Sequence, residues 1–170
     1  MFATMKKMER DLIPPEEPKR KKKTQKEIFE IPKKYTKGLS KAQAQKKTEN
    51  IKETKRLLKQ GKKKEAIELS KKRPTTKETK ESSFTMRFKK KFPNVKPLTQ
   101  KFADVTGIPL LIQKEIVKRG KGAFISAGSR ASVSSPTQWG LGRLYAFYFK
   151  GISGKLDFDK DLFKKVKLKK

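Results

Sequence analysis

Apolar residues are concentrated in the last third of the chain, and their spacing there predicts helices. Residues 98–118 show two apolar helical patterns, separated at residues 106–109 by a glycine and a proline that interrupt helices. Residues 135–138 have the serine, proline and glutamine of a helix start, and the helix that follows is apolar around nearly its whole circumference up to Gly151. Such a helix must be the buried centre of a domain. The pattern therefore predicts a mainly α fold with little or no β structure, in a compact helical domain over residues 98–163.

The residues before this domain are polar and have few apolar anchors. Residues 1–37 contain several prolines and a block of like charge, and they predict a long, extended basic arm. Residues 38–73 predict a basic helical hairpin, because Ser40 and Gln43 have capping-box spacing and Gly61 stands where a helix-ending glycine belongs. The apolar stripe of this hairpin is narrow, so the hairpin needs a partner to bury it. The alternatives are a DNA-binding face, a clip onto another protein, or a marginally stable solvated hairpin.

Two further segments complete the predicted organisation. Residues 74–97 predict a linker with an aromatic segment, and residues 164–170 predict a basic tail. In the linker, Phe84, Phe88 and Phe92 recur at every fourth position, which places three rings on one helical face. Packing into a hydrophobic groove is favoured for such a face over stacking on bases. The candidate protein-partner anchors are Phe29, Tyr35, Phe84, Phe88 and Phe92.

Composition changes the picture most through charge. The chain has 170 residues with 47 Lys and Arg against 17 Asp and Glu, a net charge of +30. Residues 1–100 carry +20 of it and residues 101–170 carry +10. Hydrophobic residues make up only 33%, which is too few for the whole chain to pack as one globule. The excess charge predicts an acidic partner, either a polyanion or an acidic protein surface.

The composition also excludes chemistry. The chain has no cysteine and no histidine, which removes disulfides, thiol nucleophiles, imidazole metal sites and the usual general base. We therefore expect no enzyme, no cofactor and no metal site. The longest wholly apolar run, residues 144–149, is six residues long, against the roughly 20 residues of a membrane helix.

Candidate contacts to an anion or a nucleic acid are cations in blocks or beside glycines. The block at residues 19–23 suits phosphate contact or nuclear import, or it is a solvated tail. The corner at Gly107 has the spacing of a helix-turn-helix bend, although any tight helical corner has the same residues. In such a bend, the residues that would face a DNA groove or its phosphates are Gln113, Lys114, Lys118 and Arg119. The full set of candidate contacts is Lys19, Arg20, Lys21, Lys22, Lys23, Lys62, Lys63, Lys64, Lys118, Arg119, Lys121, Arg130 and Arg143.

Residues 119–130 hold three glycines, two serines and three cations, and they predict a loop with a short buried strand at residues 123–125. Backbone N–H groups of this loop could surround an anion, and a structural turn is the favoured interpretation. The glycine spacing fits neither a P-loop nor a dinucleotide fingerprint. Arg143 is expected to pair with Asp157, Asp159 or Asp161, or to bind an anion. A solvated, paired edge is favoured for these carboxylates over a metal site.

The same segments resemble an uncharacterised basic domain family of large double-stranded DNA viruses and some phages. The resemblance covers residues 35–162 and is most specific over residues 119–146, and the sequence departs from the family pattern just after Arg130. It implies a viral origin and no known catalytic activity. The matching positions are Gly120, Gly122, Ala123, Phe124, Ser126, Gly128, Ser129, Arg130, Pro136, Trp139 and Arg143.

Two functional hypotheses follow. The first is a virion structural protein, a minor capsid or capsid-lining component that cross-links major and other minor capsid proteins through its basic arms. It would be present in many copies, in the virion and, during assembly, in the host cytoplasm or viral factory. The second is a viral packaging protein that binds duplex DNA without sequence specificity through its lysine clusters. Lysine far outnumbers arginine, which argues against a sequence-specific regulator.

Overall fold

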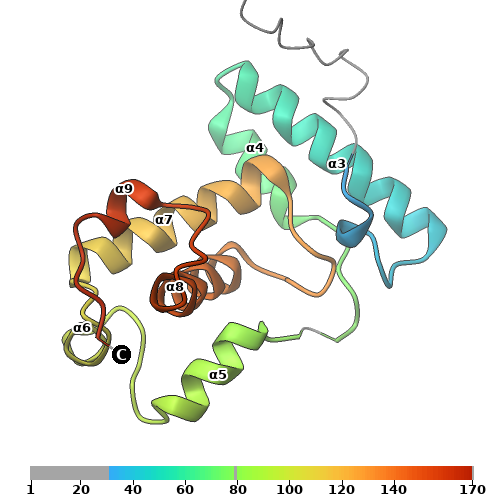
Figure 1. The fold of residues 1–170 in the computed structure, drawn as a ribbon. Helices are drawn as coiled ribbons and strands as arrows, with labels where there is room; N and C mark the ends of the chain where they lie inside the picture. Colours follow the sequence, from blue (N-terminus) through green and yellow to red (C-terminus); the bar gives the residue numbers. More distant parts are fainter. Residues whose placement is uncertain (1–30, 79, 170) are drawn as a thin grey trace, which may run out of the picture. The chain divides into compact units, whose positions relative to one another are not determined.

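The computed structural model describes residues 31–78 and 80–169, and within them the fold is helical without a β-strand, as predicted (Figure 1). The part of the predicted arm up to residue 30, with the cations of residues 19–23 and Phe29, lies outside the described residues. The elements are η2 (Lys33–Tyr35, a 3-10 helix), α3 (Lys41–Lys59), α4 (Lys63–Lys71), α5 (Ser83–Lys91), α6 (Gln100–Thr106), α7 (Leu110–Ala127), α8 (Pro136–Ile152) and α9 (Lys160–Phe163).

The basic hairpin forms as predicted from its capping residues. Ser40 Oγ accepts a hydrogen bond from the Gln43 N–H at 3.3 Å, and Gln43 Oε1 accepts one from the Ser40 N–H at 3.2 Å. This reciprocal pair satisfies two backbone donors that the first turn of α3 would otherwise leave unpaired. Gly61 then reverses the chain with a φ of +76°, in the left-handed region that glycine adopts without strain.

The partner that the hairpin needs is α7 of the same unit. Arg73, directly after α4, is buried, and its guanidinium donates to the carbonyl oxygens of Phe124 and Ile125 at 2.5 and 2.7 Å. These carbonyls belong to the last turn of α7, where a cation is favoured. Arg73 Nε also donates to Asn50 Oδ1 on α3 at 2.9 Å. Residues 31–170 consequently form one compact unit, rather than a hairpin and a separate domain.

A second cation, Lys47 of α3, lies fully buried beside this junction. Its ammonium donates to the Pro74 carbonyl oxygen at 3.2 Å, and it has no carboxylate partner among the described residues. Burial, and then the charge of Arg73, lower the pKa of Lys47 from 10.5 to about 8. At neutral pH the fold therefore holds a lysine whose charged form it disfavours.

Lys47→Met is expected to raise the free energy of unfolding by about 2 kcal/mol at pH 7, because it removes a buried charge and keeps the apolar stem. The gain should shrink between about pH 8 and pH 10.5, because there unfolded wild-type chains bind the Lys47 proton that folded chains release, and the wild type becomes more stable. Urea unfolding of both proteins across this range measures the effect. Lys46→Met, at an exposed neighbouring position, is the control and should show neither change. A constant difference across the range would contradict the lowered pKa.

The centre of the unit is the crossing of α7 and α8, which pack against each other; in Figure 1, α8 is seen nearly along its axis and α7 lies across the view. The two helices approach at two glycines. A Cβ on Gly120 would lie 2.6 Å from the Gly140 Cα atom, and a Cβ on Gly140 would lie 2.7 Å from the Val117 carbonyl oxygen. Gly140 is therefore required at this crossing, whereas a Cβ on Gly142 would lie 3.7 Å from Ser82 Oγ, an ordinary contact distance.

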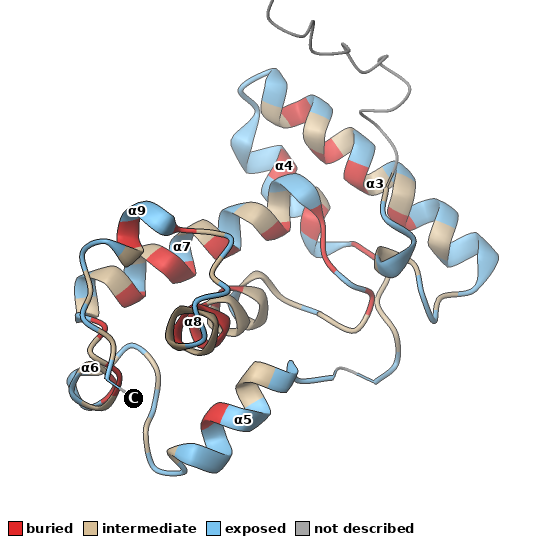
Figure 2. Cartoon of the chain, in the orientation of Figure 1, coloured by how far each residue is buried: buried red, intermediate tan, exposed pale blue. Residues whose placement is uncertain are grey.

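Aromatic residues of α8 form the core around this crossing, as its apolar circumference predicts. Buried and intermediate residues make up nearly all of α8, whereas α7 has exposed residues on the side away from the core (Figure 2). Phe88 of α5 stacks on Phe102 of α6 at 4.8 Å between ring centroids and lies 4.8 Å from the Tyr145 ring. The core residues are Phe88, Phe102, Ile108, Ile116, Val117, Leu144, Tyr145, Phe147, Tyr148 and Leu162.

Two predicted segments are wrong. Residues 119–127, expected as a loop with a strand at 123–125, continue α7 as helix up to Ala127. Both glycines within this stretch lie inside the helix: Gly120 allows the close crossing with α8, and Gly122 lies on an exposed turn of α7. Residues 164–169, expected as a tail, pack on the domain: Tyr148 Oη donates to the Lys169 carbonyl oxygen, and the Lys169 N–H donates to the Thr106 carbonyl oxygen, both at 3.0 Å.

Candidate functional site

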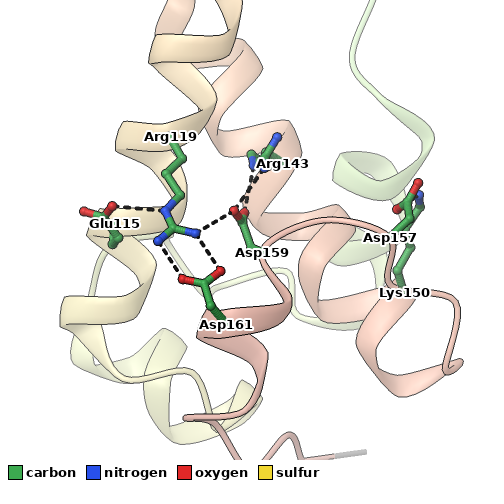
Figure 3. Close-up of polar contacts among 7 residues, drawn as sticks. All are labelled: Glu115, Arg119, Arg143, Lys150, Asp157, Asp159 and Asp161. Carbon is green, nitrogen blue, oxygen red and sulfur yellow. Dashed lines mark hydrogen bonds and ion pairs between the residues drawn. The ribbon is translucent and has the colours of Figure 1, made fainter. Parts of the chain in front are cut away.

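A network of ion pairs joins α7, α8 and α9, and it contains two of the predicted anion contacts (Figure 3). Arg143 of α8 donates through Nε and Nη2 to Asp159 at 2.8 and 3.0 Å. Arg119 of α7 donates to Asp161 at 2.7 and 2.8 Å, to Asp159 at 3.2 Å and to Glu115 at 3.1 Å. The side chain of Asp159 is only 3% exposed, so two arginines neutralise one buried carboxylate.

The charges in this network are satisfied internally. Hydrogen bonds from Arg119 lower the pKa of Asp161 to about 2, and hydrogen bonds from Asp161, Glu115 and Asp159 raise the pKa of Arg119 above its ordinary range. Among the described residues, no group of carboxylates is placed to hold a metal ion. Arg119 and Arg143 are therefore wrong as free anion contacts, because carboxylates occupy their guanidinium groups. The expected pairing of Arg143 with one of the three aspartates is confirmed for Asp159.

The helix-turn-helix interpretation fails at Gln113. The corner itself forms as predicted, with α6 ending at Thr106 and Gly107 at a φ of +75°. Gln113, however, is fully buried: its Oε1 accepts from the Leu98 N–H at 2.9 Å, and its Nε2 donates to the Ile108 carbonyl oxygen at 2.8 Å. A side chain with these partners closes the corner and reads no base.

The predicted partner anchors mostly serve the fold. Phe88 is 1% exposed, so it is wrong as an anchor for another protein, and its packing role is confirmed. Phe84 stacks on Phe149 at 6.3 Å between centroids, and Phe92 lies 5.0 Å from Phe88. Tyr35 is half-buried, with the ammonium of Lys34 at 5.9 Å from its ring centroid.

The remaining predicted cations are exposed and lie on different elements. Lys62, Lys63 and Lys64 lie at the start of α4, and Lys62 forms a 3.8 Å ion pair with Glu65. Lys118 and Lys121 lie on α7, where Lys118 forms a 3.8 Å ion pair with Glu115. Arg130 follows α7 and has no ion-pair partner among the described residues. The structure thus brings no single cluster together from this set.

The surplus charge lies on the folded unit and not on the first 30 residues. Residues 1–30 have 9 Lys and Arg against 6 Asp and Glu, a net charge of +3. Residues 31–170 have 38 against 11, a net charge of +27. Within the described residues, at least eight of these eleven carboxylates form ion pairs with neighbouring side chains. The fold therefore presents a strongly positive surface with few carboxylates available to neutralise it.

A groove of about 980 Å³ lies beside the start of α8, between this helix, α5 and the segment after α7. Cations and aromatic rings both line it, and they include Arg130, Lys80 and Trp139. Two carboxylates also line it, and both are engaged: Glu81 pairs with Lys89 at 2.5 Å, and Asp157 pairs with Lys150 at 2.6 Å. This groove is the candidate binding site.

The sequence predictions included Arg130 of the groove lining, but they missed the two buried cations and the groove residues Lys80 and Trp139. Lys47 is indistinguishable in sequence from the exposed lysines around it, because the hairpin pattern alone does not say which face α7 covers. A signal existed for Arg73: arginine is scarce in this lysine-rich chain, and its fork of donors suits several acceptors at once. Trp139 was expected in the buried centre, and the structure shows it half-buried at the groove.

No helix of the described part of the chain is long and apolar enough to cross a membrane. No curated protein and no solved structure matches the chain. A family model does match, over residues 32–163, and its description is a family of unknown function, DUF5824. The match spans α3 to α9 and nearly the same residues as the resemblance in the sequence, 35–162. The chain therefore belongs to DUF5824, a family of unknown function.

Proposed function

We propose that residues 31–170 bind nucleic acid without sequence specificity, through contacts of exposed lysines with phosphates. The observation that carries this proposal is the net charge of +27 on one folded unit, most of whose carboxylates are engaged in ion pairs. A surface with this surplus attracts a polyanion and releases the counterions condensed on it. Lysine is a flexible point charge, which suits phosphates better than the bidentate reading of base edges.

The placement of the lysines supports binding on more than one side of the unit. Exposed lysines occur on α3, α4, α5, α6 and α7, and again after α9. On α7, Lys114, Lys118 and Lys121 follow one another at helical spacing, so they share one exposed face. A unit with cationic faces in several directions can contact two duplexes at once. Condensation or packaging of DNA is the form of binding that this distribution favours.

The salt dependence of duplex binding tests the proposal. With six or more phosphate contacts, affinity should fall about 10³-fold between about 50 and 200 mM salt. Replacing Lys114, Lys118 and Lys121 together by glutamine keeps helix propensity and should lower the slope of log K against log salt by about 2 to 3. Fluorescence anisotropy with a labelled duplex measures both quantities.

Lys47→Met is the matched control, because it removes one lysine that lies buried, and its salt slope should equal that of the wild type. Absence of salt-dependent duplex binding in this range would falsify the proposal. Equal slopes for the triple variant and the wild type would exclude this face of α7 from the interface.

The minor-capsid role is a second proposal, supported by the family resemblance and its implied viral origin. It needs segments that reach neighbouring proteins, but the hairpin and residues 164–169 pack onto their own unit. The predicted basic arm, residues 1–30 of which lie outside the described residues, is the segment left for this role. Purified particles stripped of DNA by nuclease distinguish the two roles: a capsid component stays with the emptied particle, and a packaging protein leaves with the genome.

A further inference from the structure

Trp139 stands apart from the other aromatic residues of the unit. Every other aromatic side chain among the described residues contacts another ring or has a cation over it. The Trp139 indole has no such contact, and its N–H donates to no described acceptor. It lies half-buried in the first turn of α8 and lines the groove. A flat ring held without a stacking partner suits a planar ligand.

Arg130 stands apart in the same way among the arginines. Five of the six arginines in the described part of the chain contact a carboxylate, a carbonyl or an aromatic ring. Arg130 has none of these partners, is exposed and lines the groove. Because the chain uses arginine sparingly and engages it elsewhere, this guanidinium is available for an external acceptor.

Backbone contacts fix a second free cation beside Arg130. The Thr76 N–H donates to the Ala131 carbonyl oxygen at 3.0 Å, and the Lys80 N–H donates to the Ser132 carbonyl oxygen at 3.2 Å. These bonds hold Thr76 and Lys80 against the segment that follows Arg130. Lys80 is exposed, lines the groove and has no carboxylate partner in the described residues. Since Glu81 and Asp157 are already paired, the unpaired charge of the groove is positive.

We propose that this groove binds single-stranded nucleic acid, with a base stacked on Trp139 and phosphates held by Arg130 and Lys80. The inference rests on the proposed nucleic-acid binding and deepens it, because it names the form of nucleic acid that this groove takes. In a duplex, base faces are covered by their neighbours and cannot reach an indole, whereas an unpaired strand can turn a base outward. The lysines elsewhere on the unit bind phosphates of either form.

The chain has a single tryptophan, so its fluorescence reports on this groove alone. Titration with oligothymidylate of about ten nucleotides, within the site sizes of single-strand binders, should quench the emission to saturation. A duplex of equal length should also bind, as measured by the fluorescence anisotropy of a labelled strand. Its binding should leave the tryptophan emission nearly unchanged. Trp139→Ala should lower the affinity for the labelled single strand about 10-fold, and the affinity for the duplex should stay within about 2-fold of the wild-type value.

The double variant Arg130→Gln/Lys80→Gln keeps the tryptophan. Its affinity for the single strand, measured by the same quenching, should fall by a similar factor. Lys114→Gln/Lys118→Gln is the matched control: it also removes two exposed cations, but outside the groove, so it should weaken the single strand and the duplex alike and keep the preference for the single strand. Thermal melts confirm that each variant is folded.

Should the single strand bind without quenching, the groove inference is overturned and the proposed function stands. If neither form binds, the proposed function itself fails. Quenching by polyglutamate, with none by the oligonucleotide, would assign the groove to an acidic peptide instead.

Discussion

Gly120→Ala is expected to lower the free energy of unfolding by about 2 to 3 kcal/mol, because the added methyl group overpacks the crossing of α7 and α8. The added Cβ would lie 2.6 Å from the Gly140 Cα atom, which is backbone and cannot rotate away. Helices α7 and α8 must separate instead, and the contacts of the aromatic core with them loosen. Urea unfolding measures the loss, and the melting temperature should fall by about 8 °C.

Gly122→Ala is the matched control on the same helix. Nothing lies within 4 Å of the position that its Cβ would take, and the residue is exposed. This variant should gain up to about 1 kcal/mol from helix propensity, so the two alanines should act in opposite directions. Equal stability of the two variants would show that the helix crossing has room for a methyl group.

These two glycines also show where sequence analysis stopped. A glycine-rich stretch with serines predicts a loop, because glycine costs helix stability in solution. Here the tertiary contact decides: Gly120 is the residue that lets α8 approach, and the packing gained outweighs the weak local propensity. Capping signals fared better, because the bonds of Ser40 with Gln43 are local and depend on no other helix. The apolar circumference of α8 was equally informative, since it requires burial whatever the neighbours are.

The site was less predictable than the fold for a physical reason. The sequence alone does not show whether a cationic side chain lies in solvent, pairs with a carboxylate or caps a helix. Arg119 was a candidate contact for an external anion, and for Arg143 an anion and an aspartate were both open; the aspartates that hold them lie 16 to 42 residues away in sequence. Arg130 was selected for its glycine-rich context, which is in fact helical, yet it is the arginine that stays available. Long-range pairing, and not residue type, separates the two outcomes.

The distribution of net charge along the chain also differs from the sequence prediction. The division at residue 100 assigned +20 to the first part, which was predicted as a weakly folding arm. Only +3 of this belongs to residues 1–30, and the rest lies on α3, α4, α5 and their connections. These elements are held by Arg73 and by the aromatic face of α5, which are specific contacts and not general hydrophobicity. A surface of this charge is therefore presented by a folded unit, so its cations need less ordering when they bind a polyanion than those of an unfolded arm would.

Asp159→Asn is expected to lower the free energy of unfolding by about 3 kcal/mol, because it leaves two arginines facing each other without their shared carboxylate. Asparagine tolerates the left-handed backbone at this position, where φ is +49°, so the substitution removes charge and little else. The partial exposure of Arg143 and Arg119 admits some solvent screening, which places the expected loss at the lower end for a buried pair. Chemical denaturation at neutral pH measures it.

Asp157→Asn is the matched control, the same substitution two residues away. Asp157 also pairs with a cation, Lys150, but its side chain is 71% exposed. The free energy of unfolding of this variant should therefore equal that of the wild type. Adding Arg143→Gln to Asp159→Asn should restore part of the lost stability, because it relieves the repulsion between the two guanidinium groups. If the double variant instead loses the sum of the two single losses, Arg143 and Asp159 act independently, and the network does not join α8 to α9 through this pair.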